Sequence, residues 1–103
     1  MPHPKIHELI DEMIFGRTFP EVHKWIDGKF DGTNGRTHWI HRHHLKAINE
    51  EYPLQPEDTL ENMVARVHVI VDWLYYYKRI VFPESREDVI RELETEGFHT
   101  EQT

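Results

Sequence analysis

The chain has 103 residues, a formal net charge of −7 with histidine counted as neutral, and no cysteine. This length suits one small domain with a single core, and the lack of cysteine excludes disulfides, zinc–thiolate sites and thiolate-held iron–sulfur clusters. The acidic balance argues against nucleic acid as a partner, because its phosphates would be repelled. The sequence shows neither a membrane-spanning apolar run nor a signal peptide, so we expect a cytoplasmic protein that does not bind membranes.

The first two predicted helices are separated by a short break near residue 16. In residues 4–14, apolar side chains recur at steps of three and four and form a stripe that we expect to face the core: Ile6, Leu9, Ile10, Met13 and Ile14. The second helix is predicted to open at 18-TFPE-21, where Thr18 can cap the free amides and Glu21 can reach back to it. Three glycines between residues 28 and 35 then predict a loop.

The third predicted helix spans residues 36–51 and contains 37-THWIHRHH-44, with four histidines within seven residues. Six residues share one face of a helical wheel and are expected to face the core: Ile40, His41, His44, Leu45, Ile48 and Tyr52. His38 lies at the rim of that face. Trp39 and His43 point the other way, so we expect Trp39 to be on the surface.

A long fourth helix is predicted from residue 57 to residue 81 or 82, and a fifth over residues 85–94 with Ser85 as its cap. The apolar stripe expected on the fourth helix consists of Leu60, Met63, Val64, Val67, Ile70, Val71, Leu74 and Val81. No alternating strand pattern of useful length appears. We therefore predict an all-α fold, a single-domain bundle of four to five helices over residues 1–96, with residues 97–103 as a flexible C-terminal tail.

Three of the predicted helices carry a histidine followed four residues later by an aspartate. The pairs are His7/Asp11, His23/Asp27 and His68/Asp72. This spacing places both side chains on one helix face, one turn apart. The pair can chelate one metal ion, or the aspartate can hold the imidazole and fix its tautomer. One such pair is better explained by a surface ion pair. Three pairs together with the histidines of residues 38–44 make a metal site as good an explanation, because burying so many histidines without partners or a metal costs free energy.

The order of these motifs resembles a family of small uncharacterised microbial and phage proteins, known as a domain of unknown function. The matching segments are His7, 15-FGR-17, 22-VHKWID-27, 38-HWIHRHH-44 and 68-HVIVD-72. The resemblance implies that one shared pattern includes His7, His23, Asp27, His38, His43, His44, His68 and Asp72. His41 falls where that pattern has an apolar residue, and Arg17 replaces the second glycine of F-G-G. The family has no known activity, so the resemblance names no chemistry.

Our leading hypothesis from the sequence is a divalent metal site. The predicted ligands or orienting residues are His7, His23, Asp27, His38, His44, His68 and Asp72. Nitrogen and oxygen ligands suit zinc, iron, manganese or nickel, and the sequence does not choose among them. No serine or cysteine nucleophile motif is present, so an enzyme would be a hydrolase using metal-bound water, for example on phosphoesters.

The alternative hypothesis is a non-enzymatic interaction module in which the histidine–aspartate pairs are structural. The aromatic segment 73-WLYYY-77 covers more than one face of its helix, so part of it could form a partner surface. The simplest partner for such a surface is a second copy of the chain in a homodimer.

Overall fold

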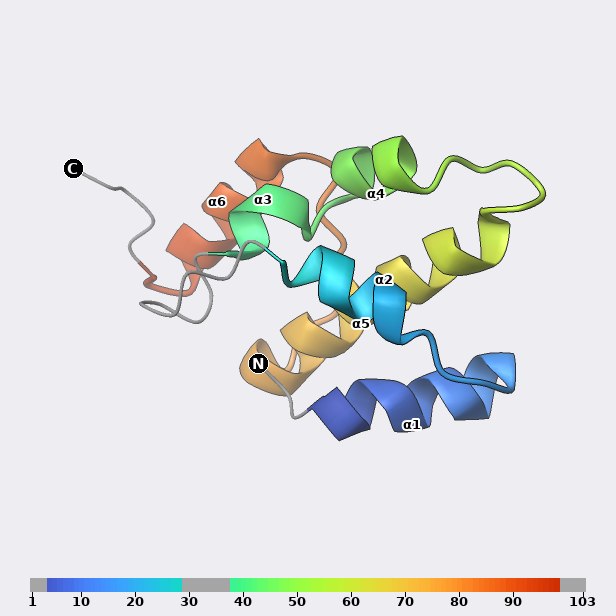
Figure 1. Ribbon diagram of the computed structural model, residues 1–103. Helices are drawn as coiled ribbons and strands as arrows, with labels where there is room; N and C mark the ends of the chain where they lie inside the picture. Colours follow the sequence, from blue (N-terminus) through green and yellow to red (C-terminus); the bar gives the residue numbers. More distant parts are fainter. Residues whose placement is uncertain (1–3, 29–37, 99–103) are drawn as a thin grey trace.

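The computed structural model describes residues 4–28 and 38–98, which contain six helices and no strand (Figure 1). The helices are α1 (Pro4–Phe15), α2 (Pro20–Ile26), α3 (Trp39–Arg42), α4 (Leu45–Glu51), α5 (Thr59–Tyr77) and α6 (Arg86–Thr95). The predicted all-α class is confirmed, and five of these helices have seven residues or more. The predicted glycine loop lies almost wholly outside the described residues, as does the predicted tail after residue 98.

Helix α5 is the longest helix of the described part and the centre of its packing. Helices α1, α2 and α4 pack against α5, and α3 packs against α6 (Figure 1). Trp39 of α3 and Trp73 of α5 meet in the core with ring centroids 5.1 Å apart. The buried apolar residues are Phe19, Val22, Ile26, Trp39, Ile40, Ile48, Val64, Ala65, Val69, Trp73, Val89 and Leu93. None of the described helices combines the length and the apolar character needed to cross a membrane.

The single helix predicted for residues 36–51 is divided into α3 and α4 at His43 and His44. His44 is extended, with φ −154° and ψ 160°, and its Nδ1 accepts the Ala47 N–H at 3.3 Å as the cap of α4. Because the backbone turns here, a continuous helical wheel does not apply across it. Trp39 and His43 are therefore fully buried and His41 is exposed, which makes the predicted faces of these three residues wrong.

Helix α1 also presents a different face to the core from the predicted one. His7 and Asp11 are buried. Leu9, Met13 and Ile14, which were expected to face the core, are 59%, 83% and 56% exposed. The polar edge faces inward because its side chains bond to groups on α2 and α5. Leu9, Met13 and Ile14 are left on the surface, whereas Ile6 and Ile10 are half-buried.

The ends of α2 and α5 differ from their predicted positions. Phe19, not Thr18, precedes α2, and its N–H donates to the Asp11 carboxylate at 3.1 Å, so the expected Thr18 cap is wrong. Helix α5 stops at Lys78, whose left-handed conformation (φ 57°) ends the helix before residue 81. After α6, Phe98 packs against the core.

Candidate metal centre

A group of histidines and aspartates lies where α1, α2, α5 and the residues flanking α3 meet. We call it the histidine–aspartate cluster; its members are His7, Asp11, His23, Asp27, His38, His43, His68 and Asp72. Within the cluster, the side chains of His23 and Asp27 are 14% and 18% exposed, and the others are buried. The cluster is thus an interior site with a limited opening at two of its members.

Each aspartate of the cluster contacts at least one histidine that lies outside its own helix. Asp11 Oδ2 lies 2.6 Å from His23 Nε2, and Asp72 Oδ1 lies 3.2 Å from His7 Nε2. The members of the His68/Asp72 pair also contact each other, with 3.2 Å between Nε2 and Oδ2. These contacts therefore join helices that are far apart in the sequence, which a local pair on one helix cannot do.

Four side chains of the cluster form a cage that could hold a metal ion: Asp27, His43, His68 and Asp72. Asp72 Oδ2 lies 2.9 Å from His43 Nε2 and 3.2 Å from His68 Nε2. Asp27 Oδ1 lies 3.4 Å from each of the same two nitrogens. A tetrahedral ion bound at 2.0–2.2 Å needs ligand atoms about 3.3–3.6 Å apart. The two edges at Asp27 fall within this range, and the two at Asp72 are shorter than its lower limit by about 0.1 and 0.4 Å.

Further histidines hold the two carboxylates of the cage from outside. His38 Nε2 lies 3.0 Å from Asp27 Oδ1, and His7 Nε2 contacts the Asp72 oxygen that faces away from the cage. Such contacts fix the orientation of a ligating carboxylate, which raises the affinity of a metal site. The cage thus has a supporting layer of side chains in addition to its four ligands.

His68 belongs to two groups of ligand atoms, because its two ring nitrogens face different neighbours. Its Nε2 faces the carboxylates of the cage, and its Nδ1 lies 2.8 Å from His23 Nδ1. The second group consists of His7, His23 and His68, whose ligand atoms also lie within 4.8 Å of one another. The His7 ring stacks on the His68 ring, with centroids 3.8 Å apart and planes at 10°.

The hydrogen bonds assign tautomers to the two histidines that share the 2.8 Å contact. Asp11 is an acceptor, so the His23 Nε2–H donates to it and His23 Nδ1 carries a lone pair. His68 Nδ1–H then donates to His23 Nδ1. His68 Nε2 is buried and has no partner of hydrogen-bond geometry among the described residues, although two carboxylates lie within 3.4 Å. This nitrogen is therefore directed at the centre of the cage.

The electrostatics of the cage favour a cation. Burial lowers the pKa of His68, but the nearby carboxylates of Asp72 and Asp27 outweigh it and raise the pKa to about 9. Burial raises the pKa of Asp27, but hydrogen bonds from histidines, with His38 first, hold it well below the ordinary value. Burial also raises the pKa of Asp72, but the charge of His68 and then the hydrogen bond from His43 hold it well below the ordinary value. Two buried carboxylates require a compensating positive charge, either an imidazolium or a metal ion.

The structure brings six of the seven predicted ligand residues into the cluster: His7, His23, Asp27, His38, His68 and Asp72. His44 lies outside both groups, because its Nδ1 caps α4. His43 lies in the cage, although the helical wheel placed it on the outer face. The family-like pattern contained His43, and it was the one signal in the sequence that pointed to it. Asp11 was expected to act with His7, and its contact with His23 was missed.

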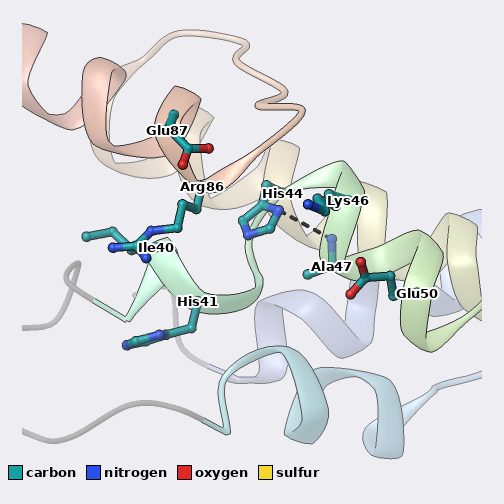
Figure 2. A pocket seen from close by; sticks show the side chains of 8 residues that line it. All are labelled: Ile40, His41, His44, Lys46, Ala47, Glu50, Arg86 and Glu87. Atoms are coloured by element: carbon teal, nitrogen blue, oxygen red, sulfur yellow. Dashed lines mark hydrogen bonds between the residues drawn. The ribbon is translucent and has the colours of Figure 1, made fainter.

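Two cavities in the described part of the chain lie outside the cluster. One of about 330 Å³ lies between α3, α4 and α6 and includes His41, His44 and Arg86 in its lining (Figure 2). Another, of about 410 Å³, lies beside the segment that joins α5 to α6. Neither is lined by a cluster residue, so neither offers a substrate cleft at the cage.

Comparisons of the chain with protein-family models, with curated proteins and with solved structures found no match. The family resemblance of the sequence motifs therefore stays a prediction. The chemistry of the cluster is argued below from its own residues.

Proposed function

We propose that this chain binds a divalent transition-metal ion in the cage formed by Asp27, His43, His68 and Asp72. The observation that carries the proposal is the set of four ligand–ligand distances of 2.9–3.4 Å, made by side chains from separate segments. Two imidazoles and two carboxylates suit zinc, iron, manganese or nickel. Two carboxylates also balance the charge of one divalent ion.

The unpartnered Nε2 of His68 supports a metal ion over a network of hydrogen bonds alone. A fully buried polar atom without a partner costs about 1–3 kcal/mol, and most such atoms in native proteins are satisfied. This nitrogen has no hydrogen-bond partner within the described part of the chain. An ion at the centre of the cage would take its lone pair and would bind the oxygens of Asp27 and Asp72 at the same time.

The position of the cage gives the bound ion a role in stability. Asp27 is the C-cap of α2, His43 the C-cap of α3, and His68 and Asp72 are one turn apart on α5. An ion bound by all four would join these segments. Its binding free energy would then contribute to folding, because the unfolded chain does not hold the four ligands together.

The direct test is the metal content of untagged protein purified without nickel resin or chelator. We expect His43→Ala to lose the ion of the cage. His41→Ala is the matched control, because His41 lies two residues away but is exposed and outside the cluster. Wild-type protein without metal, and without a thermal shift on adding zinc, manganese, iron or nickel, would exclude the metal site.

We propose hydrolysis, for example of phosphoesters, as the activity of the metal-loaded protein. Four side chains fill a tetrahedral site, so this chemistry requires the ion to take water as a fifth ligand. Asp27 is the ligand of the cage with appreciable exposure, at 18%, so water would enter beside it. The test is release of nitrophenol from nitrophenyl phosphate mono- and diesters by zinc-, manganese-, iron- and nickel-loaded protein. Equal rates for wild type and His43→Ala would show that the cage is not an active site.

A homodimeric interaction module is the second candidate function, and the exposed stripe of α1 favours it. Leu9, Met13 and Ile14 lie on one side of α1 and are mostly exposed. A monomer seldom leaves such a stripe in water, and exposed apolar patches mark interaction surfaces. Sedimentation of the wild type as a monomer at micromolar concentration would exclude a dimer through this stripe.

A further inference from the structure

A metal ion in the cage would bind only one of the two ring nitrogens of His68. Its Nε2 faces the cage, and its Nδ1 faces the lone pair of His23 Nδ1 at 2.8 Å. The ligand atoms of His7, His23 and His68 also lie within 4.8 Å of one another. Two potential metal groups therefore share one imidazole ring, with one ring nitrogen available to each.

We propose that the chain holds a second divalent metal ion, bound by His7, His23 and the Nδ1 of His68. The inference rests on the proposed cage, because His68 would then bridge the two ions as an imidazolate. The second ion has three nitrogen ligands from α1, α2 and α5 and keeps a position for water. A chain of this size would thus carry a dinuclear centre.

His23 is oriented for this role by Asp11. The carboxylate of Asp11 accepts the His23 Nε2–H at 2.6 Å and also accepts the Phe19 N–H at 3.1 Å, so it is held firmly in place. A carboxylate bonded to the remote nitrogen of a histidine is the usual support of a metal-binding imidazole. The contact leaves His23 Nδ1 as the ligand atom.

His7 is supported in the same way, but its ring has to turn. Its Nε2 contacts Asp72 Oδ1 at 3.2 Å, which leaves Nδ1 with a lone pair when Nε2–H donates. Because the His7 ring stacks nearly parallel to His68, the in-plane lone pairs of the two rings do not converge on one point. A tilt of His7 is needed, and the contact between His23 and His68 opens by about half an ångström to reach a tetrahedral edge.

The charge of the cluster supports two ions. Asp11, Asp27 and Asp72 supply three negative charges to an interior site, and one divalent ion leaves one of them uncompensated. An uncompensated buried charge is costly. Two divalent ions with an imidazolate at His68 make the cluster neutral. The second ion forms its bond to His68 Nδ1 as the proton on that nitrogen leaves to solvent, so one proton is released from the bridge.

The first experiment is metal stoichiometry by native mass spectrometry with zinc alone, after removal of metal with a chelator. We expect two zinc ions per chain in the wild type and in the control His41→Gln, and one in His23→Gln. The one remaining ion and an unchanged circular dichroism spectrum would show that His23→Gln is folded. Asp11→Asn is a milder variant. We expect it to lower the affinity for the second ion 10–100-fold and to retain the first ion.

The outcomes separate this inference from the proposed function. One zinc ion in the wild type would overturn the second site and leave the cage intact, whereas no zinc would overturn both. Two ions in His23→Gln would overturn the assignment of His23. The bridge is tested with copper(II): electron paramagnetic resonance should show two coupled ions in the wild type and an isolated ion in His23→Gln. Two uncoupled copper signals in the wild type would exclude a shared His68.

Discussion

Asp11 on α1 holds the ring of His23 on α2, with 2.6 Å between Oδ2 and Nε2, although the aspartate four residues after His23 is Asp27. Asp27 in turn contacts His38, His43 and His68. A motif that is local in the sequence therefore acts between helices in the fold. The stability of the helix packing and the chemistry of the cluster depend on the same side chains.

Asp11→Ala should lower the free energy of unfolding by about 2–4 kcal/mol, because the Phe19 N–H and the His23 N–H both lose a buried acceptor. Urea denaturation of the metal-free protein measures this change. Glu12→Ala, at the exposed next position of α1, is the control and should change stability by less than about 0.5 kcal/mol. Equal effects of the two substitutions would mean that the Asp11 contacts add no stability.

Asp72→Asn should remove a charged ligand of the cage while keeping the size of the side chain. We expect zinc affinity to fall at least tenfold and the rise in Tm on adding zinc to shrink, since a neutral amide is a weaker ligand than a carboxylate. Isothermal titration with zinc gives the affinity, and Glu50→Gln on the exposed face of α4 is the control. Unchanged zinc affinity in Asp72→Asn would place the ion elsewhere.

The metal-free protein should lose stability as the pH rises from 6.5 to 9. The pKa of His68 is raised from 6.5 to about 9 in the fold, so its stabilising protonation is complete below pH 6.5 and is lost as the pH passes through the folded value. Thermal unfolding in the presence of a chelator, measured across this range, tests the sign. The metal-free His68→Gln variant should lack this loss, and a wild type whose stability rises over the same range would contradict the assignment.

The stabilisation of the protein by zinc should increase with pH, because the histidine and carboxylate ligands bind zinc only without their protons. The increase in Tm produced by a fixed zinc concentration should therefore grow from pH 6 to pH 8. His43→Ala should show little increase at either pH. A zinc effect that is constant across this range would indicate binding outside the histidines.

Lys78→Gly should stabilise the protein by up to about 1 kcal/mol, because Lys78 ends α5 in the left-handed region that glycine adopts without strain. Chemical denaturation is the measurement. Lys78→Ala keeps the β-carbon and should give no such gain. A loss of stability in Lys78→Gly would show that the side chain contributes more than the strain costs.

Some features of the fold and the site were determined by the sequence itself. Periodic apolar residues and well-placed prolines and glycines are local signals, and they predicted the helical class and most of the helices. The histidines and aspartates, in a chain without cysteine, also limited a metal site to nitrogen and oxygen ligands. Of the predicted ligands, His44 is the one that the fold places outside the cluster.

Tertiary packing decided which of these residues meet. The backbone turn at His43 and His44 redirects every side chain around it, so His43 enters the cage and His44 caps α4. Likewise α1 turns His7 and Asp11 inward because their partners lie on α5 and α2, and Leu9, Met13 and Ile14 remain outside. Helical periodicity describes neighbours one turn apart, whereas a metal cage depends on distances between segments that only the packed chain brings together.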